Sequence, residues 1–232
     1  MKRLIIADIH ANLPAFEAIL EDVGDFDEVL FLGDLVMCGP NPAECIDLLQ
    51  SLKTIGIIGN HDLEVLDMKD SPVLDIFQSW ASWTLSQLSS KHLDYLQSLP
   101  ETAVVNIAGK KAKMIHALTY DKYLLPSIED EELFRYMENC SEEIILCGHT
   151  HRLIDRTIKG KRFISVNAVG QPKDSNCQAG YTIESDGVFE HKRVDYDIAK
   201  YIDDVQKIAF PKPYIKRWIN FIKTGYDPEW TE

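Results

Sequence analysis

Long hydrophobic runs are missing from this sequence of 232 residues. No apolar stretch approaches the ~20 residues that a membrane-spanning helix requires. The N-terminal stretch MKRLIIADIH carries basic residues, but an aspartate interrupts it too early for a secretory signal peptide. We therefore expect a cytoplasmic protein that has no membrane partner.

Cysteine is also scarce, and its pattern excludes two further classes of protein. The five cysteines are odd in number and include no Cys-x-x-Cys pair. Such a set is typical of a reducing compartment rather than of a disulfide framework. A zinc-finger site is excluded because no cysteine has the necessary spacing.

Positive charge is the third shortage. Lysine and arginine number 24 against 37 aspartates and glutamates, so the net charge is −13. A surface of this charge repels polyanions, and we expect no broad nucleic-acid-binding face. A small phosphate substrate stays compatible, since bound metal ions can reverse the charge locally.

The chain is nevertheless long and apolar enough for a sizeable core. Of its residues, 45% are hydrophobic and 26% are charged, as in ordinary globular proteins. No Gly/Ser-rich linker, low-complexity segment or repeat period divides it. We assign residues 1–232 to a single domain.

The first part of the chain alternates strand and helix patterns. This alternation is typical of a parallel sheet with right-handed crossovers. Strands are expected at residues 3–7, 28–32 and 54–58, and helices after the N-cap residue Asn12 and from Pro42 to about Ser51.

A helical insertion is expected next, over about residues 62–99, beside the candidate site. Pro72 and the Ser89-Ser90 pair divide it into shorter helices. Trp80 and Trp83 are more readily explained as core of this insertion than as a platform for a nucleobase.

From residue 101 the pattern predicts a second, mostly antiparallel sheet packed on the first, with helices outside. Glycine-containing turns separate its strands. The strands are expected at 102–107, 112–116, 143–147, 153–158, 162–166, 179–184 and 187–194, with one helix at about 129–139.

Two amphipathic helices are expected at the C-terminal end, within about residues 197–223. An apolar stripe at helical spacing runs along the second helix. We favour packing of this stripe on the core over a dimer contact, so a homo-oligomer has no specific support. The stripe consists of Ile215, Trp218, Ile219 and Ile222.

Five short motifs each follow a predicted strand at its C-terminal end, the edge where open α/β sheets bind ligands. Asp8, Asp34 and Asn60 are 26 residues apart, one strand–helix unit each. Three adjacent parallel strands would bring these side chains together. The motifs are ADIHAN (7–12), GDLVMCGP (33–40), GNHD (59–62), MIHA (114–117) and CGHTH (147–151).

The side chains in these motifs suit a pair of metal ions. Imidazole, carboxylate and amide donors favour manganese, iron or zinc, whereas magnesium and calcium rely on oxygen ligands. Seven candidate ligands are too many for one ion and suit two ions that share a bridge. The candidates are Asp8, His10, Asp34, Asn60, His116, His149 and His151.

Each motif taken alone also has a plain structural explanation. Asp8 and His10 could belong to a helix-capping loop, Asn60 to a turn, and His116 to the core. Cys38 is more readily explained as a packed thiol than as a reactive one. The metal hypothesis is favoured over these structural explanations, because all of them would have to hold at once.

Together, the motifs resemble the calcineurin-like metallophosphoesterases, and in particular their small single-domain bacterial and archaeal phosphodiesterases. They occur in the order of that family, and FISVNAVGQP (163–172) and SLPE (98–101) resemble the small members too. Ala7, Ala11 and Ala117 depart from the usual pattern without removing a ligand. The resemblance implies a four-layer α/β/β/α sandwich of two mixed β-sheets flanked by helices.

The resemblance also implies how the candidate ligands divide between the ions. Two divalent ions are implied, manganese first, with iron, zinc or nickel as alternatives. Asp8, His10 and His151 would bind the first ion, Asn60, His116 and His149 the second, and Asp34 would bridge both.

Catalysis is implied to use a hydroxide between the metals as the nucleophile. His61 would bind no metal but would stabilise the transition state and protonate the leaving oxygen. Asp62 is suited to orient the His61 ring, and Asn60 is also expected to touch the phosphate.

The substrate is expected to be a small phosphodiester. A nucleotide, such as a dinucleoside polyphosphate, is a narrower choice within the same chemistry. A phosphomonoesterase or protein phosphatase is less favoured. A non-catalytic metal-binding scaffold of the same fold is the alternative from a different class, although every ligand position and His61 are intact.

Overall fold

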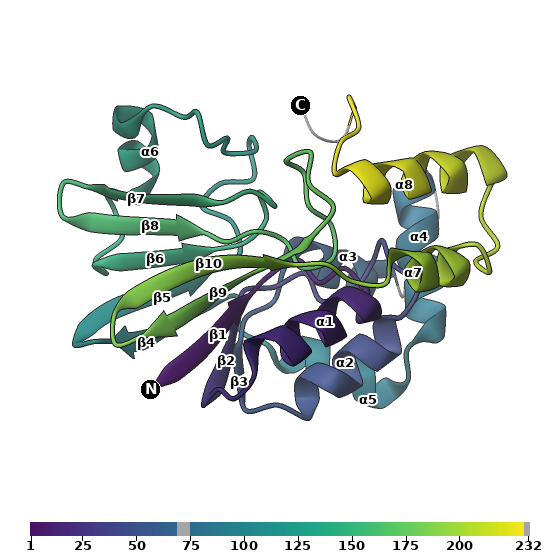
Figure 1. Cartoon of the computed structure of the whole chain (residues 1–232), viewed down its shortest axis with the longest axis horizontal. Coiled ribbons are helices and arrows are strands. Elements are labelled where there is room, and N and C mark those ends of the chain that lie inside the picture. The colour runs from purple at the N-terminus through teal and green to yellow at the C-terminus, as the bar shows by residue number, and fades with distance from the viewer. Residues whose placement is uncertain (69–74, 230–232) are drawn as a thin grey trace.

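The protein consists of two β-sheets that face each other, with helices on both outer sides (Figure 1). The computed structural model describes residues 1–68 and 75–229. The first sheet contains β1 (Lys2–Ile6), β2 (Glu28–Phe31), β3 (Thr54–Gly56), β9 (Ala179–Ser185) and β10 (Val188–Val194), in the order β10-β9-β1-β2-β3. The second contains β4 (Thr102–Ile107), β5 (Lys110–Ile115), β6 (Ile144–Cys147), β7 (Ile154–Ile158) and β8 (Lys161–Ser165), in the order β4-β5-β6-β8-β7.

Helices lie between and after these strands. They are α1 (Leu13–Val23), α2 (Pro42–Gln50), α3 (Asn60–Asp67), α4 (Ile76–Gln87), α5 (Ser90–Ser98), α6 (Asp130–Met137), α7 (Ile198–Val205) and α8 (Lys212–Thr224). Local sequence sets several of their starts. The Asn12 side chain accepts a hydrogen bond from the Ala15 N–H and caps α1, and Ser89 caps α5 in the same way.

Successive side chains along a strand point to opposite faces of the sheet, and this alternation separates the core between the sheets from the cores beneath the helices. In β1, Leu4 and Ile6 face a core beneath α1, α2 and the C-terminal helices, whereas Ile5 faces the core between the sheets. In β6, Leu146 also points between the sheets, and Ile145 packs beneath α6. The predicted four-layer α/β/β/α architecture is therefore confirmed.

The last two strands correct one prediction. Residues 179–184 and 187–194 were expected in the second sheet, but β9 pairs antiparallel with β1 and extends the first sheet. The second sheet is mixed rather than mostly antiparallel, because β5, β6 and β8 are parallel to one another. The turn at Asp186-Gly187 joins β9 to β10, but its sequence does not indicate which sheet these strands enter.

The helical insertion is present, and its first helix begins at Asn60, so the GNHD motif lies in the first turn of α3. The division at Ser89-Ser90 is confirmed, because α4 ends at Gln87 and α5 begins at Ser90, with Ser89 as its N-cap. Pro72 lies outside the described residues. Trp80 is fully buried and Trp83 packs against the same core, as expected.

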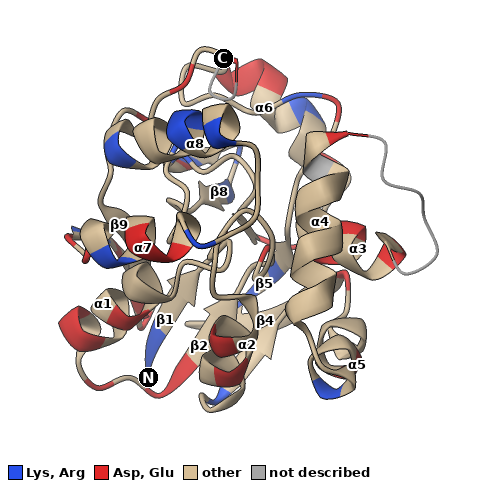
Figure 2. Cartoon of the chain, turned by 90° about the vertical axis from the view of Figure 1, so that its right-hand side faces the viewer, with Lys and Arg blue, Asp and Glu red and all other residues tan. Residues whose placement is uncertain are grey.

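The C-terminal helices pack on the core beside the first sheet. Trp218 Nε1 in α8 donates a hydrogen bond to Tyr201 Oη in α7, which donates to the carbonyl oxygen of Cys38. The stripe on α8 therefore covers the core, as favoured above. Figure 2 shows basic residues (blue) along α8 and acidic residues (red) on α1, α2 and α3.

Within residues 1–68 and 75–229, no helix combines the length and apolar character needed to cross a membrane.

Candidate metal centre and active site

The loops that follow β1, β2 and β6 hold their polar residues in a rare backbone conformation. The φ angles are 56° at Asp8, 49° at His10, 60° at Asp34, 65° at His149 and 59° at His151. Residues other than glycine seldom adopt this left-handed region, and such strain collects at functional sites. Five of the predicted ligands therefore share this conformation.

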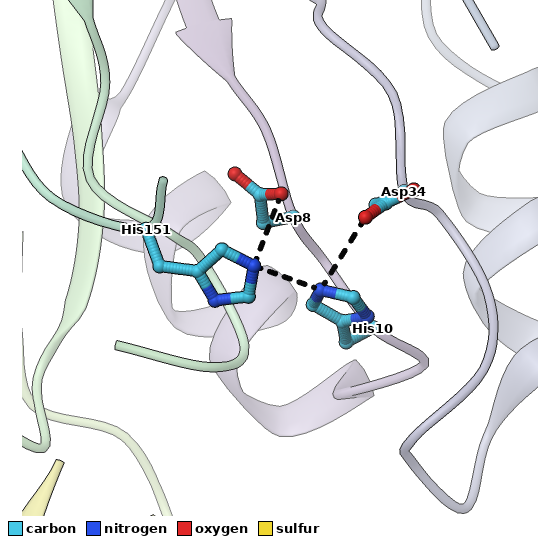
Figure 3. A group of neighbouring side chains, drawn as sticks. All are labelled: Asp8, His10, Asp34 and His151. Atoms are coloured by element: carbon cyan, nitrogen blue, oxygen red, sulfur yellow. Dashed lines mark hydrogen bonds and ion pairs between the residues drawn. The ribbon is translucent and has the colours of Figure 1, made fainter. Parts of the chain in front are cut away.

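Asp8, His10, Asp34 and His151 form a buried cluster whose possible ligand atoms all lie within 4.8 Å of one another (Figure 3). His151 Nε2 lies 3.4 Å from Asp8 Oδ1 and 3.3 Å from His10 Nε2. His10 Nε2 lies 3.7 Å from Asp34 Oδ2. These residues lie in the loops that follow β1, β2 and β6, as the strand-end argument predicted.

Asp34 also faces a second group of side chains. His116 Nε2 lies 3.2 Å from Asp34 Oδ2, and His149 Nδ1 lies 3.0 Å from Asn60 Oδ1. The rings of His116 and His149 contact each other edge to face, with centroids 5.3 Å apart. All seven predicted ligands therefore converge, with Asp34 between the two groups.

Backbone carbonyls orient two of the imidazoles. His116 Nδ1 donates to the carbonyl oxygen of Leu32 at 2.7 Å, and His151 Nδ1 donates to that of Gln171. Each ring therefore turns its Nε2 toward the carboxylates. Such a hydrogen bond on the far nitrogen is the usual support of a metal-binding histidine.

Burial dominates the electrostatics of the cluster. It raises the pKa of Asp8 to about 7 and lowers the pKa values of His10 and His149 to about 3. Burial would also lower the pKa of His116, but the Asp34 and Asp8 carboxylates raise it to about 9. Neutral His10 and His149 are in the form that binds metals, and a bound cation would favour the ionised Asp8.

Unpaired polar atoms show that the cluster fits a cation. Asp34 Oδ2 and His116 Nε2 are buried and face each other at 3.2 Å, but neither makes a hydrogen bond of regular geometry in the described part of the chain. Leaving such atoms unpaired is costly, and in native proteins it calls for an ion or a water. Carboxylate and imidazole donors together suit a borderline divalent metal.

Two motif glycines allow the loops to approach this closely. A Cβ added at Gly59 would overlap Oδ1 of Asp34, and one at Gly33 would lie 2.7 Å from His116 Nδ1. Gly33 also has a φ of 93°, which favours glycine. The glycines in GD and GN are therefore required by the packing of the site.

Comparison with known proteins identifies the family. A model of the calcineurin-like phosphoesterase superfamily domain matches residues 1–186. The chain belongs to this superfamily. An uncharacterized protein from Methanocaldococcus jannaschii is 33% identical over 235 residues, which cover 90% of this chain and 93% of that protein.

Solved structures show the same fold as this calcineurin-like phosphoesterase. A metallophosphoesterase from Sphaerobacter thermophilus matches with a TM-score of 0.81 and 27% identity, over 97% of this chain and 99% of that one. A hypothetical protein from Pyrococcus horikoshii OT3 matches with a TM-score of 0.85 and 18% identity, over the same shares. Family membership supports hydrolysis of a phosphoester, and the family uses divalent metals that the buried Asp/His cluster can bind.

In this phosphoesterase the His61 side chain lies beside the cluster and is 19% exposed. Its backbone N–H donates to Asp34 Oδ1 at 2.9 Å, and its ring contacts His10 edge to face. The ring Nδ1 lies 3.0 Å from Glu64 Oε2, one helical turn along α3. His61 is thus placed at the rim, with Glu64 as its carboxylate partner.

The predicted role of Asp62 is wrong. Its carboxylate does not contact the His61 ring but accepts backbone N–H groups of Asp34, Leu35, Val36 and Gly59, at 2.8 to 3.0 Å. The third position of α3 points back into the turn, whereas Glu64 lies on the same side of the helix as His61. A helix start placed at Asn60 would have predicted this partner.

Two further side chains were missed. Lys173 is buried close to the cluster, where burial lowers its pKa to about 8 although the Asp8 carboxylate favours its charge. Its Nζ lies 4.5 Å from the ring centroid of Tyr123, and Tyr123 stacks on His149 at 5.0 Å. Lys173 directly follows the stretch 163–172 that resembles the small family members, the one signal that could have found it.

Cys38 is a buried, unpaired thiol, and burial raises its pKa far above the usual range. It is therefore packed rather than reactive, as expected. The other four cysteines are also unpaired.

Proposed function

We propose that the protein is a metal-dependent phosphodiesterase whose two divalent ions share Asp34. One observation carries the proposal. Asp34 Oδ2 is buried without a hydrogen bond of regular geometry, and it lies 3.7 Å from His10 Nε2 and 3.2 Å from His116 Nε2, its ion-pair partner. A carboxylate oxygen between two imidazoles suits a ligand that serves two ions at once.

The proposed division of ligands follows the two groups of side chains around Asp34. Manganese is the proposed ion, with iron, zinc or nickel as alternatives, because the donors combine imidazole, carboxylate and amide groups. Asp8, His10 and His151 would hold one ion, and Asn60, His116 and His149 the other.

When bound, the ions would supply Lewis-acid stabilisation of the phosphoryl group and activation of the attacking water. His61 would hold a proton at the rim and give it to the leaving oxygen, while Glu64 fixes the orientation of its ring. The Asn60 side-chain amide would also contact the phosphate. Phosphodiesters come first among substrates, as the resemblance to the small phosphodiesterases implies, and nucleotides are the narrower choice.

The test is hydrolysis of bis(p-nitrophenyl) phosphate and of p-nitrophenyl phosphate by metal-stripped protein. Manganese, zinc, iron, nickel and magnesium are added back separately. Manganese-dependent cleavage that favours the diester supports the proposal. Protein that binds two ions and cleaves neither ester would contradict it and favour a scaffold.

Asp34→Asn tests the shared ligand. The amide is nearly isosteric but carries no charge, so we expect kcat/KM to fall by more than about 100-fold and the bound metal to fall below two ions. Activity and metal content are measured on the same samples. Asp186→Asn is the matched control, because the Asp186 side chain is 90% exposed. Full activity of the Asp34→Asn variant would contradict the assignment of Asp34 as the shared ligand.

A further inference from the structure

Three cavities border the candidate site, and their charges differ. One of about 380 Å³ is lined by Asn60 together with Glu64, Asp67 and Glu101, and carries no lysine or arginine among the described residues. One of about 470 Å³ adjoins His61 and is lined by Glu64, Asp67 and Asp75, likewise without a described basic side chain apart from His61. Both are unfavourable for an anion.

The third cavity, of about 370 Å³, is different because Lys173 lines it. We refer to it as the Lys173 pocket. It extends from Asn60 and His61 at the candidate site to Trp218 on α8, with Tyr123 as a further wall.

In the described part of the chain, Lys173 brings to this pocket a positive charge that has no ion-pair partner. The residue is 9% exposed, and the hydroxyl of Tyr123, 3.4 Å from Nζ, is its hydrogen-bond partner. No carboxylate in the described ranges makes an ion pair with its ammonium group. Buried ammonium groups are normally paired, since the loss of hydration is costly.

The two acidic side chains of the Lys173 pocket do have partners. Glu64 lies 3.0 Å from the His61 ring nitrogen, and Glu229 accepts a hydrogen bond from Arg217 at 2.6 Å. Neither is therefore engaged with Lys173. The ammonium group remains available to an anionic ligand.

The position of His61 indicates which part of a substrate would enter. An acid that protonates the leaving oxygen must lie on the side of the leaving group. His61 lines two of the three cavities, and of these the Lys173 pocket has the lysine. An anionic leaving group therefore fits there.

We infer that Lys173 binds a phosphate carried by the leaving group, so that the preferred substrates are phosphodiesters or phosphoanhydrides with a second phosphoryl group next to the scissile one. This inference rests on the proposed function. Water adds to phosphorus and loses a proton to solvent, the bond from phosphorus to the leaving oxygen breaks, and that oxygen takes a proton from His61. Lys173 remains charged and exchanges no proton.

The test compares two inhibitors of bis(p-nitrophenyl) phosphate hydrolysis by the manganese-loaded protein, at fixed free metal. AMP offers one phosphoryl group, and α,β-methylene-ADP offers two. We expect the wild type to prefer the second inhibitor by about tenfold, as for one additional charge-assisted contact in a buried pocket. Lys173→Met should remove this preference, whereas Lys173→Arg should retain it. Lys53→Met is the matched control, because the Lys53 side chain is 71% exposed.

Equal inhibition of the wild type by the two compounds would overturn the inference, and so would an unchanged preference in Lys173→Met. A preference that also disappears in Lys53→Met would point to general charge rather than to the pocket. If the wild type cleaves no diester with any metal, the proposed function fails instead. Calorimetric titration of the two inhibitors would then still measure the preference at Lys173 directly.

Discussion

Single residues at this site combine strained backbone with buried charge. The left-handed conformations of Asp8 and Asp34 aim their carboxylates inward, and Gly59 leaves the space for Asp34. Such conformations cost of order 1–3 kcal/mol each and persist only where the surroundings enforce them. The arrangement therefore favours ligand geometry over local stability.

Glu64 is the residue whose role is most directly testable. We propose it as a positioning residue, because its carboxylate lies 3.0 Å from His61 Nδ1 and would keep a proton on that nitrogen, which leaves Nε2 to give the proton to the leaving oxygen. Glu64→Gln should lower kcat by about tenfold, part of the 10²–10⁴ that general acids contribute, and should change KM little. The loss should be larger for diesters with poor leaving groups.

The measurement is a series of aryl phosphodiesters of increasing leaving-group pKa. The control is Glu190→Gln, because the Glu190 side chain is 63% exposed on β10. A uniform loss across the series, or a loss confined to KM, would contradict a role through His61.

The motifs predicted the convergence of the ligand residues well, because spacing and strand ends determine it. Asp8, Asp34 and Asn60 each follow a parallel strand, so their proximity is a consequence of topology. The function of Asp62 was not predictable in this way, because it depends on where α3 begins. Lys173 was missed because, apart from its place directly after the stretch 163–172, no local pattern distinguishes a buried lysine from an exposed one.

Asp62 links α3 to the loop that follows β2. It sits in the first turn of α3, and its carboxylate accepts N–H groups of the loop after β2 as well as that of Gly59. Asp62→Ala would leave buried donors without partners. We expect the free energy of unfolding to fall by about 3 kcal/mol, since each unsatisfied donor costs about 1–3 kcal/mol and partial relaxation reduces the sum.

Urea denaturation of the metal-free protein measures this loss. Asp94→Ala, in an exposed part of α5, is a suitable control for the removal of an acidic side chain from a neighbouring helix. A loss below about 0.5 kcal/mol, the range of ordinary surface substitutions, would show that the loop is held in another way.

Local sequence patterns predicted the positions of the strands, but they did not predict which strands pair with each other. Strand and turn signals placed β4 at the predicted residues and β9 within one residue of them. The sheet that β9 joins depends on its pairing with β1, more than 170 residues away in sequence. Such contacts are decided by the global packing of the two apolar faces, which no local window contains.

At the scale of the whole molecule, polar contacts join β7 and β8 of the second sheet to β10 of the first. Asp155 on β7 binds Arg162 on β8 through two hydrogen bonds of 2.8 and 2.7 Å, and it binds His191 on β10 at 2.9 Å. Arg162 also lies 4.5 Å from the ring centroid of Phe189 on β10. The second sheet is thereby fixed to the edge of the first.

This contact predicts a pH-dependent contribution to stability. Burial alone would raise the pKa of Asp155, but Arg162 and His191 hold it well below its usual range. A carboxyl with a lowered pKa in the folded state stabilises the protein above its unfolded value of about 3.9, and the effect is lost as pH falls below that value. Asp155→Asn should therefore cost about 1 kcal/mol at pH 7, a value reduced for solvent screening.

Urea unfolding of the wild type and of Asp155→Asn at pH 7, 5 and 3 measures this difference. It should be the same at pH 7 and 5 and smaller at pH 3, with Asp186→Asn showing no such trend. A difference that stays constant down to pH 3 would mean that the variant loses packing rather than charge. A smaller difference at pH 3 would show that an ionised carboxylate helps to hold the two sheets together. Acid would then weaken the contact between the sheet that contains β1 and β2 and the sheet that contains β6.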